Sequence, residues 1–187
     1  MKKSSTDKTL DTFEEWMHLY IEFLAKVVRA KQVVKHPFEK REVIEAFVLR
    51  IAAVWEILAE ELMIDCLNRD SSQLGKHLDL TLDKDLPRPV CRAIVAGLNY
   101  FDFKSTGDLK KKAKRILAPS HNPFKAISKG NGQRIDEFFA LRNYLAHYSQ
   151  QSRRSVKRLY TENHGLTRFR EPGTSSMHRR DITVRSG

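Results

Sequence analysis

Cysteine, glycine and proline are scarce in this chain of 187 residues, which has 2 Cys, 8 Gly and 6 Pro. So little glycine and proline excludes collagen-like and low-complexity chains, and an apolar share of 41% excludes a wholly disordered one. The cysteines, Cys66 and Cys91, form no disulfide framework at this length and lack metal-ligand spacing. We therefore expect a folded protein of a reducing compartment, with no bound metal and no cofactor.

Long uninterrupted hydrophobic runs are also missing. The most apolar stretch, residues 43–67, contains six charged side chains, which excludes a membrane span. Lysines near the N-terminus are followed by no apolar segment, so the sequence predicts no signal peptide. A chain of this length buries roughly 70% of its unfolded surface in one domain. We expect a cytoplasmic protein with no membrane partner.

Acidic residues are outnumbered by basic ones. The 34 Lys and Arg residues exceed the 23 Asp and Glu residues, so the formal net charge is +11. Such an excess favours a polyanionic partner, although the same charge can simply aid solubility.

Apolar residues recur with helical spacing along most of the chain. Thr12 and Glu15 match a capping box, and a stripe from Phe13 to Val27 predicts a first helix that ends before Pro37. A second helix is predicted over residues 38–68. Its inward residues are expected to be Phe47, Ile51, Val54, Leu58 and Leu62, with the region of Trp55.

The remaining segments predict shorter helices and connections. Residues 70–87 read as a connection, and helices are expected over 89–100 and 107–117. Residues 119–132 predict a loop with a helical turn at most, and a last strong helix covers 133–160. No strand pattern appears. The prediction is an all-α, up-and-down helical bundle over residues 11–162, with an N-terminal tail over 1–10 and a mobile basic tail over 163–187.

The last helix has two distinct faces at 100° per residue. With Leu145 at the centre of the buried face, Phe138, Leu141 and Tyr148 lie near it, and the stripe continues to Val156 and Leu159. Asn143 and His147 fall on the opposite side, on the same line as Ala140 and beside Phe139. This outer face predicts contact with a second copy of the chain, since a two-fold axis uses one patch twice.

The residues Arg142, Asn143 and His147 form an Arg-Asn-x3-His motif inside this helix. Similar Arg–His spacings occur elsewhere, but only this pair lies inside a strong amphipathic helix. The motif resembles that of HEPN domains, and residues 54–67 resemble the second helix of the group related to RiboL-PSP-HEPN. The resemblance implies a dimer that places two motifs across a shared cleft. Many members are metal-independent endoribonucleases of toxin–antitoxin and antiviral systems; others are inactive RNA- or nucleotide-binding forms.

Metal-independent RNA cleavage needs a base, a cation and an acid. His147 can accept the ribose 2′-OH proton, and Arg142 can hold the non-bridging phosphate oxygens. Asn143 can bond the imidazole or the phosphate, and the partner subunit's His147 is the expected acid. The products would be a 2′,3′-cyclic phosphate and a 5′-hydroxyl. Some family toxins carry Tyr two residues after the His; here Tyr148 follows directly, and we expect it in the core.

Two basic clusters are candidate RNA contacts. The clusters comprise Lys110, Lys111, Lys112, Lys114 and Arg115 in one helix and Arg153, Arg154, Lys157 and Arg158 after the motif. Contacts to phosphates would make binding depend on salt, whereas the alternative for each cluster is a solvated helix face. Glu56, Glu60 and Glu61 either orient the motif residues or only solvate their helix.

We therefore predict a dimeric HEPN-type endoribonuclease acting in stress response, toxin–antitoxin or antiviral defence, with an antitoxin or other defence protein as a further partner. One alternative is a non-catalytic helical module that binds RNA or a protein, with Arg142 and His147 merely bridging helices. Another is an antitoxin-like protein whose basic tail binds nucleic acid.

Overall fold

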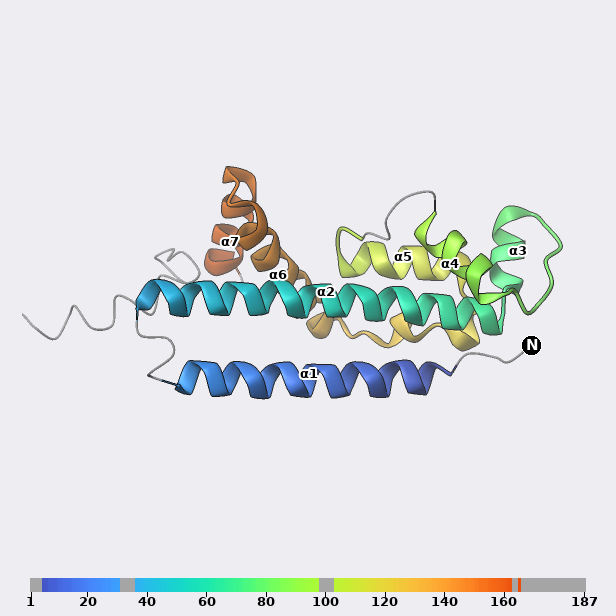
Figure 1. The fold of residues 1–187 in the computed structure, drawn as a ribbon. Helices are drawn as coiled ribbons and strands as arrows, with labels where there is room; N and C mark the ends of the chain where they lie inside the picture. Colours follow the sequence, from blue (N-terminus) through green and yellow to red (C-terminus); the bar gives the residue numbers. More distant parts are fainter. Residues whose placement is uncertain (1–4, 31–35, 98–102, 163–164, 166–187) are drawn as a thin grey trace, which may run out of the picture. The chain divides into compact units, whose positions relative to one another are not determined.

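The structure is a computed structural model that describes residues 5–30, 36–97, 103–162 and 165. Within these ranges the chain forms helices and no strands (Figure 1). In order they are α1 (Thr6–Arg29), α2 (Pro37–Arg69), α3 (Ser72–Leu78), α4 (Arg88–Ala96), α5 (Thr106–Ile116), the 3-10 turns η1 (Pro119–His121) and η2 (Pro123–Ala126), α6 (Lys129–His147) and α7 (Gln150–Glu162). The predicted all-α helical bundle is confirmed. The predicted tail over 163–187 lies outside the described residues, apart from Gly165.

The chain divides into two compact units, each built from segments distant in the sequence. The first unit comprises Met1–Glu15 and Val54–Asp136, and the second comprises Trp16–Ala53 and Glu137–Gly187. The single domain expected over residues 11–162 stays a prediction.

The core of the first unit surrounds the C-terminal part of α2. Residues 62–68 are all buried, so this end of the helix contacts protein on every side. Met63, Ile64 and Leu67 are fully buried, as are Cys91 of α4 and Leu109 of α5. A helix buried all round shows no single apolar stripe. The predicted inward set is only partly right, because the enclosed part of α2 begins near its last members. Leu62 is buried, whereas the others are half-buried: Phe47, Ile51, Val54, Trp55 and Leu58.

The connection predicted over residues 70–87 contains a short helix, α3, that the prediction missed. Ser71 organises this region, because its amide donates to the Lys84 carbonyl at 3.0 Å and its hydroxyl donates to the Asp83 carbonyl. The helix ends where Asp79 adopts a left-handed conformation, with φ +56°, and the Leu80 amide donates to the Gly75 carbonyl at 2.9 Å. Contacts from later residues therefore fold a segment that has no sustained periodicity of its own.

Helix α1 begins at Thr6, so the predicted start at Thr12 is wrong. The Ser5 hydroxyl accepts from the Lys8 amide at 3.4 Å, three residues on, as an N-cap does. The Thr12 hydroxyl instead donates back to the Lys8 carbonyl at 2.8 Å, which places it inside the helix. The helix ends at Arg29, before Pro37, as predicted.

Helix α5 agrees with its prediction, whereas two other helix ends differ. Helix α4 stops at Ala96, before Gly97 with φ +66°, and residues 98–100 of its predicted span lie outside the described residues. Helix α6 begins at Lys129 rather than at residue 133, because the Ser128 hydroxyl accepts from the Asn131 amide at 3.1 Å and caps it. Residues 119–126 form two 3-10 turns, slightly more than the single turn expected.

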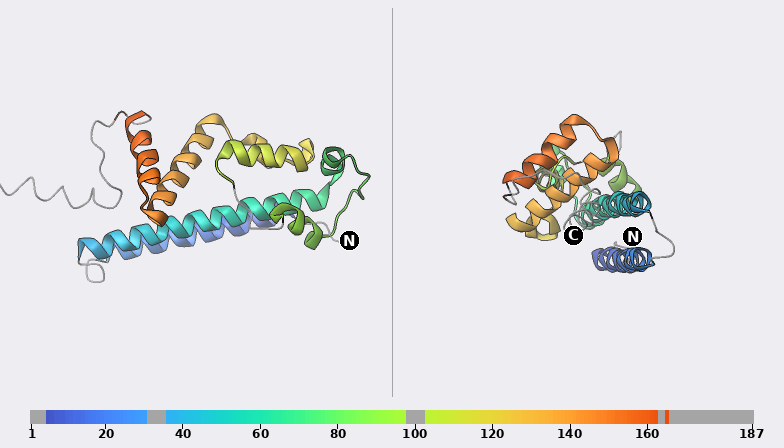
Figure 2. Two further views of the ribbon diagram at one scale, coloured as in Figure 1. Left: turned by 90° about the horizontal axis from the view of Figure 1, so that it is seen from above. Right: turned by 90° about the vertical axis from the view of Figure 1, so that its left-hand side faces the viewer.

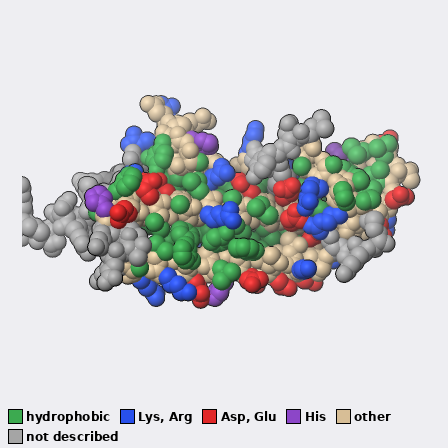
Figure 3. Space-filling model, in the orientation of Figure 1, with side chains coloured by type: hydrophobic (Ala, Val, Ile, Leu, Met, Phe, Trp, Pro, Cys, Tyr) green, Lys and Arg blue, Asp and Glu red, His purple; other side chains and the backbone are tan. Residues whose placement is uncertain are grey.

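In the second unit, α1 from Trp16 onward and the first half of α2 pack as antiparallel neighbours (Figure 1). Phe23 and Phe47 place their rings 5.6 Å apart, and the Arg50 guanidinium donates to the Tyr20 hydroxyl at 2.8 Å. Trp16, Leu19 and Phe23 are nevertheless about half exposed, and apolar side chains appear at the surface along these helices (Figure 3).

The second unit also contains a helical hairpin, formed by α6 from Glu137 onward and by α7 (Figure 2). Its core is Tyr144, Leu145 and Val156, against which Val48 and Leu49 of α2 pack. The prediction of one helix over 133–160 is therefore wrong, because the chain turns at residues 148 and 149. Tyr148 has φ +46°, and the Ser149 hydroxyl accepts from the Ser152 amide at 3.1 Å, which caps α7.

Candidate functional site

The three motif residues lie in the last two turns of α6. Asn143 and His147 are exposed and stand one helical turn apart, so they share one face of the helix. Arg142 is half-buried, and its Nη1 donates to Asn143 Oδ1 at 3.0 Å. A direct hydrogen bond thus joins two of the three residues, and the third occupies the same helix end.

The predicted faces of this helix are partly right. Asn143 and His147 do lie away from the core, which is centred on the buried Tyr144 and Leu145. Ala140, expected on the outer face, packs against this core instead. Tyr148, expected in the core, is 53% exposed. Its positive φ takes it out of helical geometry, so the angular map no longer applies at that residue.

Tyr148 donates its hydroxyl hydrogen to the carboxylate of Glu45 on α2. Glu45 is buried, and the Nε of Arg41, one turn earlier, lies 3.5 Å from its other oxygen. Partial desolvation of the phenol oxygen, together with its hydrogen bond to Glu45, raises the pKa of the Tyr148 phenol to about 12, although the side chain as a whole is half exposed. Sequence reasoning missed both partners; the available signal was a carboxylate inside the most apolar stretch of the chain.

The basic cluster of α7 follows the motif after the turn. Arg153, Arg154, Lys157 and Arg158 are all exposed, and Arg158 lies 3.8 Å from Glu162. A shallow, mostly apolar hollow lies between α6 and α7, lined by Glu137, Leu141, Val156, Leu159 and Tyr160. It contains no motif residue, so the candidate site is the exposed end of α6 and not this hollow.

The basic cluster of α5 belongs to the first unit and is partly engaged within it. The Lys110 ammonium donates to the Ile127 carbonyl, and Lys112 lies 3.5 Å from Asp108. Lys111, Lys114 and Arg115 are exposed. Only part of this cluster is therefore available to a phosphate backbone without breaking bonds inside the unit.

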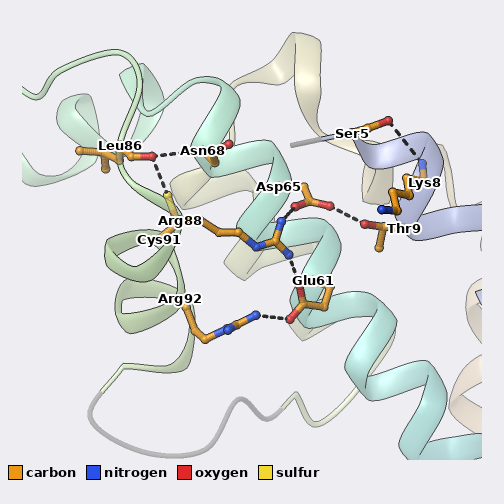
Figure 4. A network of polar contacts seen from close by, with 10 residues as sticks. All are labelled: Ser5, Lys8, Thr9, Glu61, Asp65, Asn68, Leu86, Arg88, Cys91 and Arg92. Atoms are coloured by element: carbon orange, nitrogen blue, oxygen red, sulfur yellow. Dashed lines mark hydrogen bonds and ion pairs between the residues drawn. The ribbon is translucent and has the colours of Figure 1, made fainter. Parts of the chain in front are cut away.

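Glu61, a candidate to orient the motif, belongs to a polar network in the first unit (Figure 4). Its carboxylate pairs with Arg88 and with Arg92 of α4. Arg88 also pairs with Asp65, whose second oxygen accepts from the Thr9 hydroxyl at 2.6 Å. Asp65 is fully buried. The network joins α1, α2 and α4, and Glu61 serves that packing.

Other classes of site find little support in the part of the chain that the structure describes. Cys66 and Cys91 are buried, and burial raises the pKa of Cys66 to about 11, so neither resembles a nucleophilic thiolate. Among these residues no three His, Cys, Asp or Glu side chains are grouped as metal ligands. None of the described helices has the length and apolar content that crossing a membrane requires.

Comparisons with protein-family models, with curated proteins and with solved structures found no match to this chain.

Proposed function

We propose that this chain is a HEPN-type, metal-independent endoribonuclease that cleaves RNA at a site formed by Arg142, Asn143 and His147. The observation that carries the proposal is the exposed end of α6, where His147 and Asn143 share one face and Asn143 accepts from Arg142. The imidazole can serve as the base and the guanidinium as the cation in phosphodiester cleavage, and the amide can bond either the imidazole or the phosphate.

The proposed reaction is an internal transesterification. His147 takes the proton of the ribose 2′-OH, and the 2′-oxygen attacks phosphorus as the bond to the 5′-oxygen breaks. Arg142 stabilises the negative charge on the non-bridging oxygens, and the 5′-oxygen receives a proton from the partner subunit's His147. The products are a 2′,3′-cyclic phosphate and a 5′-hydroxyl.

The charge of the molecule supports RNA as the substrate. The formal net charge is +11, and Arg153, Arg154 and Lys157 are exposed on the helix that follows the motif. Cations near the reacting end of α6 would hold the flanking phosphates. We place the activity in a cytoplasmic homodimer of stress response, toxin–antitoxin or antiviral defence, with an antitoxin or defence protein as a partner.

The test is cleavage of single-stranded RNA by the purified full chain in EDTA. The wild type should elute as a dimer of the 21.7 kDa chain and leave 2′,3′-cyclic phosphate ends, identified by mass spectrometry. Arg142→Ala and His147→Ala should each lower kcat/KM on the order of 100-fold or more, because each removes a group used in the transition state.

Two matched substitutions serve as controls. His18→Ala removes an exposed histidine of α1, and Arg134→Ala removes an exposed arginine of α6 outside the motif. Both should cleave at the wild-type rate. If the wild type and all variants bind RNA without cleaving it, the protein is instead the non-catalytic binding module. If the motif variants cleave as fast as the wild type, the proposed site is refuted.

A further inference from the structure

Tyr148 directly follows α6 and has a backbone conformation that residues other than glycine rarely adopt. Its φ is +46°, and it shares a positive φ with only Asp79 among the described non-glycine residues. For a bulky residue the left-handed region costs roughly 1–2 kcal/mol, so the surrounding structure must hold it there. Strain of this kind in the residue directly after His147 calls for a physical cause.

Three contacts hold the strained residue. Its amide donates to the Tyr144 carbonyl at 2.7 Å, its ring packs edge-on against Tyr144 with centroids 5.3 Å apart, and its hydroxyl donates to Glu45. The first two are local to α6. The third comes from α2, 103 residues away in sequence, and it is the one that a local helix pattern cannot supply.

The carboxylate that receives this bond is buried and lies beside a cation. Glu45 is 8% exposed, and Arg41 lies on the same face of α2 with its Nε 3.5 Å from Glu45 Oε1. The Arg41 guanidinium also stacks over the Phe38 ring, 5.4 Å from its centroid. The contact between Arg41 and Glu45 is an ion pair without a hydrogen bond between the two atoms, so the bond from Tyr148 is the hydrogen bond that Glu45 makes across to α6.

Two backbone paths can be compared at the residues that follow His147. Residues 133–160 contain neither glycine nor proline, and their pattern predicts one continuous helix. In the structure the chain turns after His147 instead, with Ser149 capping α7. If Tyr148 relaxed to a negative φ, α6 would run on into α7, and His147 would lie in mid-helix rather than at an exposed helix end.

We propose that Tyr148 and Glu45 are positioning residues for His147. Their hydrogen bond ends α6 after His147 and thereby fixes the position of the imidazole relative to the substrate. The inference rests on the proposed nuclease function for its catalytic consequence. Neither residue is assigned contact with RNA. A displacement of about 1 Å in a catalytic group can lower the rate on the order of 100-fold, so a single distant bond can matter.

The test compares Tyr148→Phe, Glu45→Ala and Glu45→Gln in the full chain. Tyr148→Phe and Glu45→Ala should lower kcat by about 10-fold to 100-fold with little change in KM. The double variant should be no worse than either single one, since both remove the same bond. Glu45→Gln keeps an oxygen that accepts from the phenol and should retain most of the activity. Tyr20→Phe, which removes a phenol bonded to Arg50, is the matched control and should match wild type.

A second readout does not depend on activity. The ring signal of His147 and the backbone signals of residues 147–150 should shift in NMR spectra of Tyr148→Phe and Glu45→Ala, and stay unchanged in Tyr20→Phe. If the wild type cleaves no RNA but these shifts occur, the proposed function fails and the positioning role stands. Variants that lose thermal stability or activity without any change at His147 would overturn the inference, as would variants that change neither.

Discussion

Single side chains with long-range partners organise the first unit. Asp65 is the clearest case, because a fully buried carboxylate is tolerated only where cations and donors surround it. Arg88 and the Thr9 hydroxyl fill that role from two different helices (Figure 4). Arg88 also bonds Glu61, so one guanidinium compensates two carboxylates.

Arg88→Ala should therefore destabilise the protein by about 2 kcal/mol or more, since it leaves the buried Asp65 without its cation. This loss of unfolding free energy is smaller than for a wholly buried ion pair, because the Arg88 side chain is 39% exposed. Urea unfolding followed by circular dichroism measures it. Arg92→Ala, which removes a 53% exposed partner of Glu61, should cost at most about 1 kcal/mol. Equal costs for the two variants would contradict this account.

Helix ends are decided by specific capping contacts and close approaches. At Gly75 in α3 there is no room for a side chain, because a Cβ at this position would lie 2.8 Å from the Leu80 carbonyl oxygen. That oxygen belongs to the backbone and cannot rotate away. Gly130 in the first turn of α6 has no neighbouring atom within 4 Å of such a Cβ, and its φ is not positive.

Gly75→Ala and Gly130→Ala should thus change stability in opposite directions. The first should cost about 1–3 kcal/mol through overpacking against the Leu80 carbonyl. The second should gain roughly 0.5 kcal/mol, because alanine reduces the freedom of the unfolded chain and favours helix. Thermal melts of the two variants beside wild type give the comparison. A stabilised Gly75→Ala would show that α3 does not approach Leu80 as described.

At the scale of the whole molecule, the proposed binding of RNA should depend on the excess positive charge. Each phosphate contact releases a counterion, so the logarithm of the binding constant falls with the logarithm of salt by about 0.7 per contact on a single strand. Exposed cations lie on helices of both units, including Lys111 and Lys114 on α5 and Lys157 on α7.

Replacing Arg153, Arg154 and Lys157 together by alanine should reduce this salt slope by about 2, if all three meet phosphates. Fluorescence anisotropy with uncleavable 2′-O-methyl RNA measures the slope between 50 mM and 200 mM salt. The control removes the same charge at the exposed Lys8, Lys76 and Lys129 and should change the slope by less than half as much. An equal effect of both triple variants would show that net charge, and not the α7 cluster, governs binding.

The sequence alone determined the helical class, the approximate span of α2 and α5, and the exposure of Asn143 and His147. These follow from apolar spacing, which is a local property of the chain. Ser149 and Ser128 are good capping residues, but a serine caps a helix only where the backbone already turns. The sequence therefore did not show which of its serines mark helix ends.

Only the tertiary structure decided the break after His147, the burial of residues 62–68 of α2 on all sides and the pairing of Tyr148 with Glu45. Each depends on a partner supplied by a distant segment, and the Tyr148–Glu45 bond joins residues 103 positions apart. Local periodicity favours a continuous helix through Tyr148, whereas a carboxylate on another helix favours the turn. Such competition between local propensity and a long-range contact is resolved only when the chain has folded.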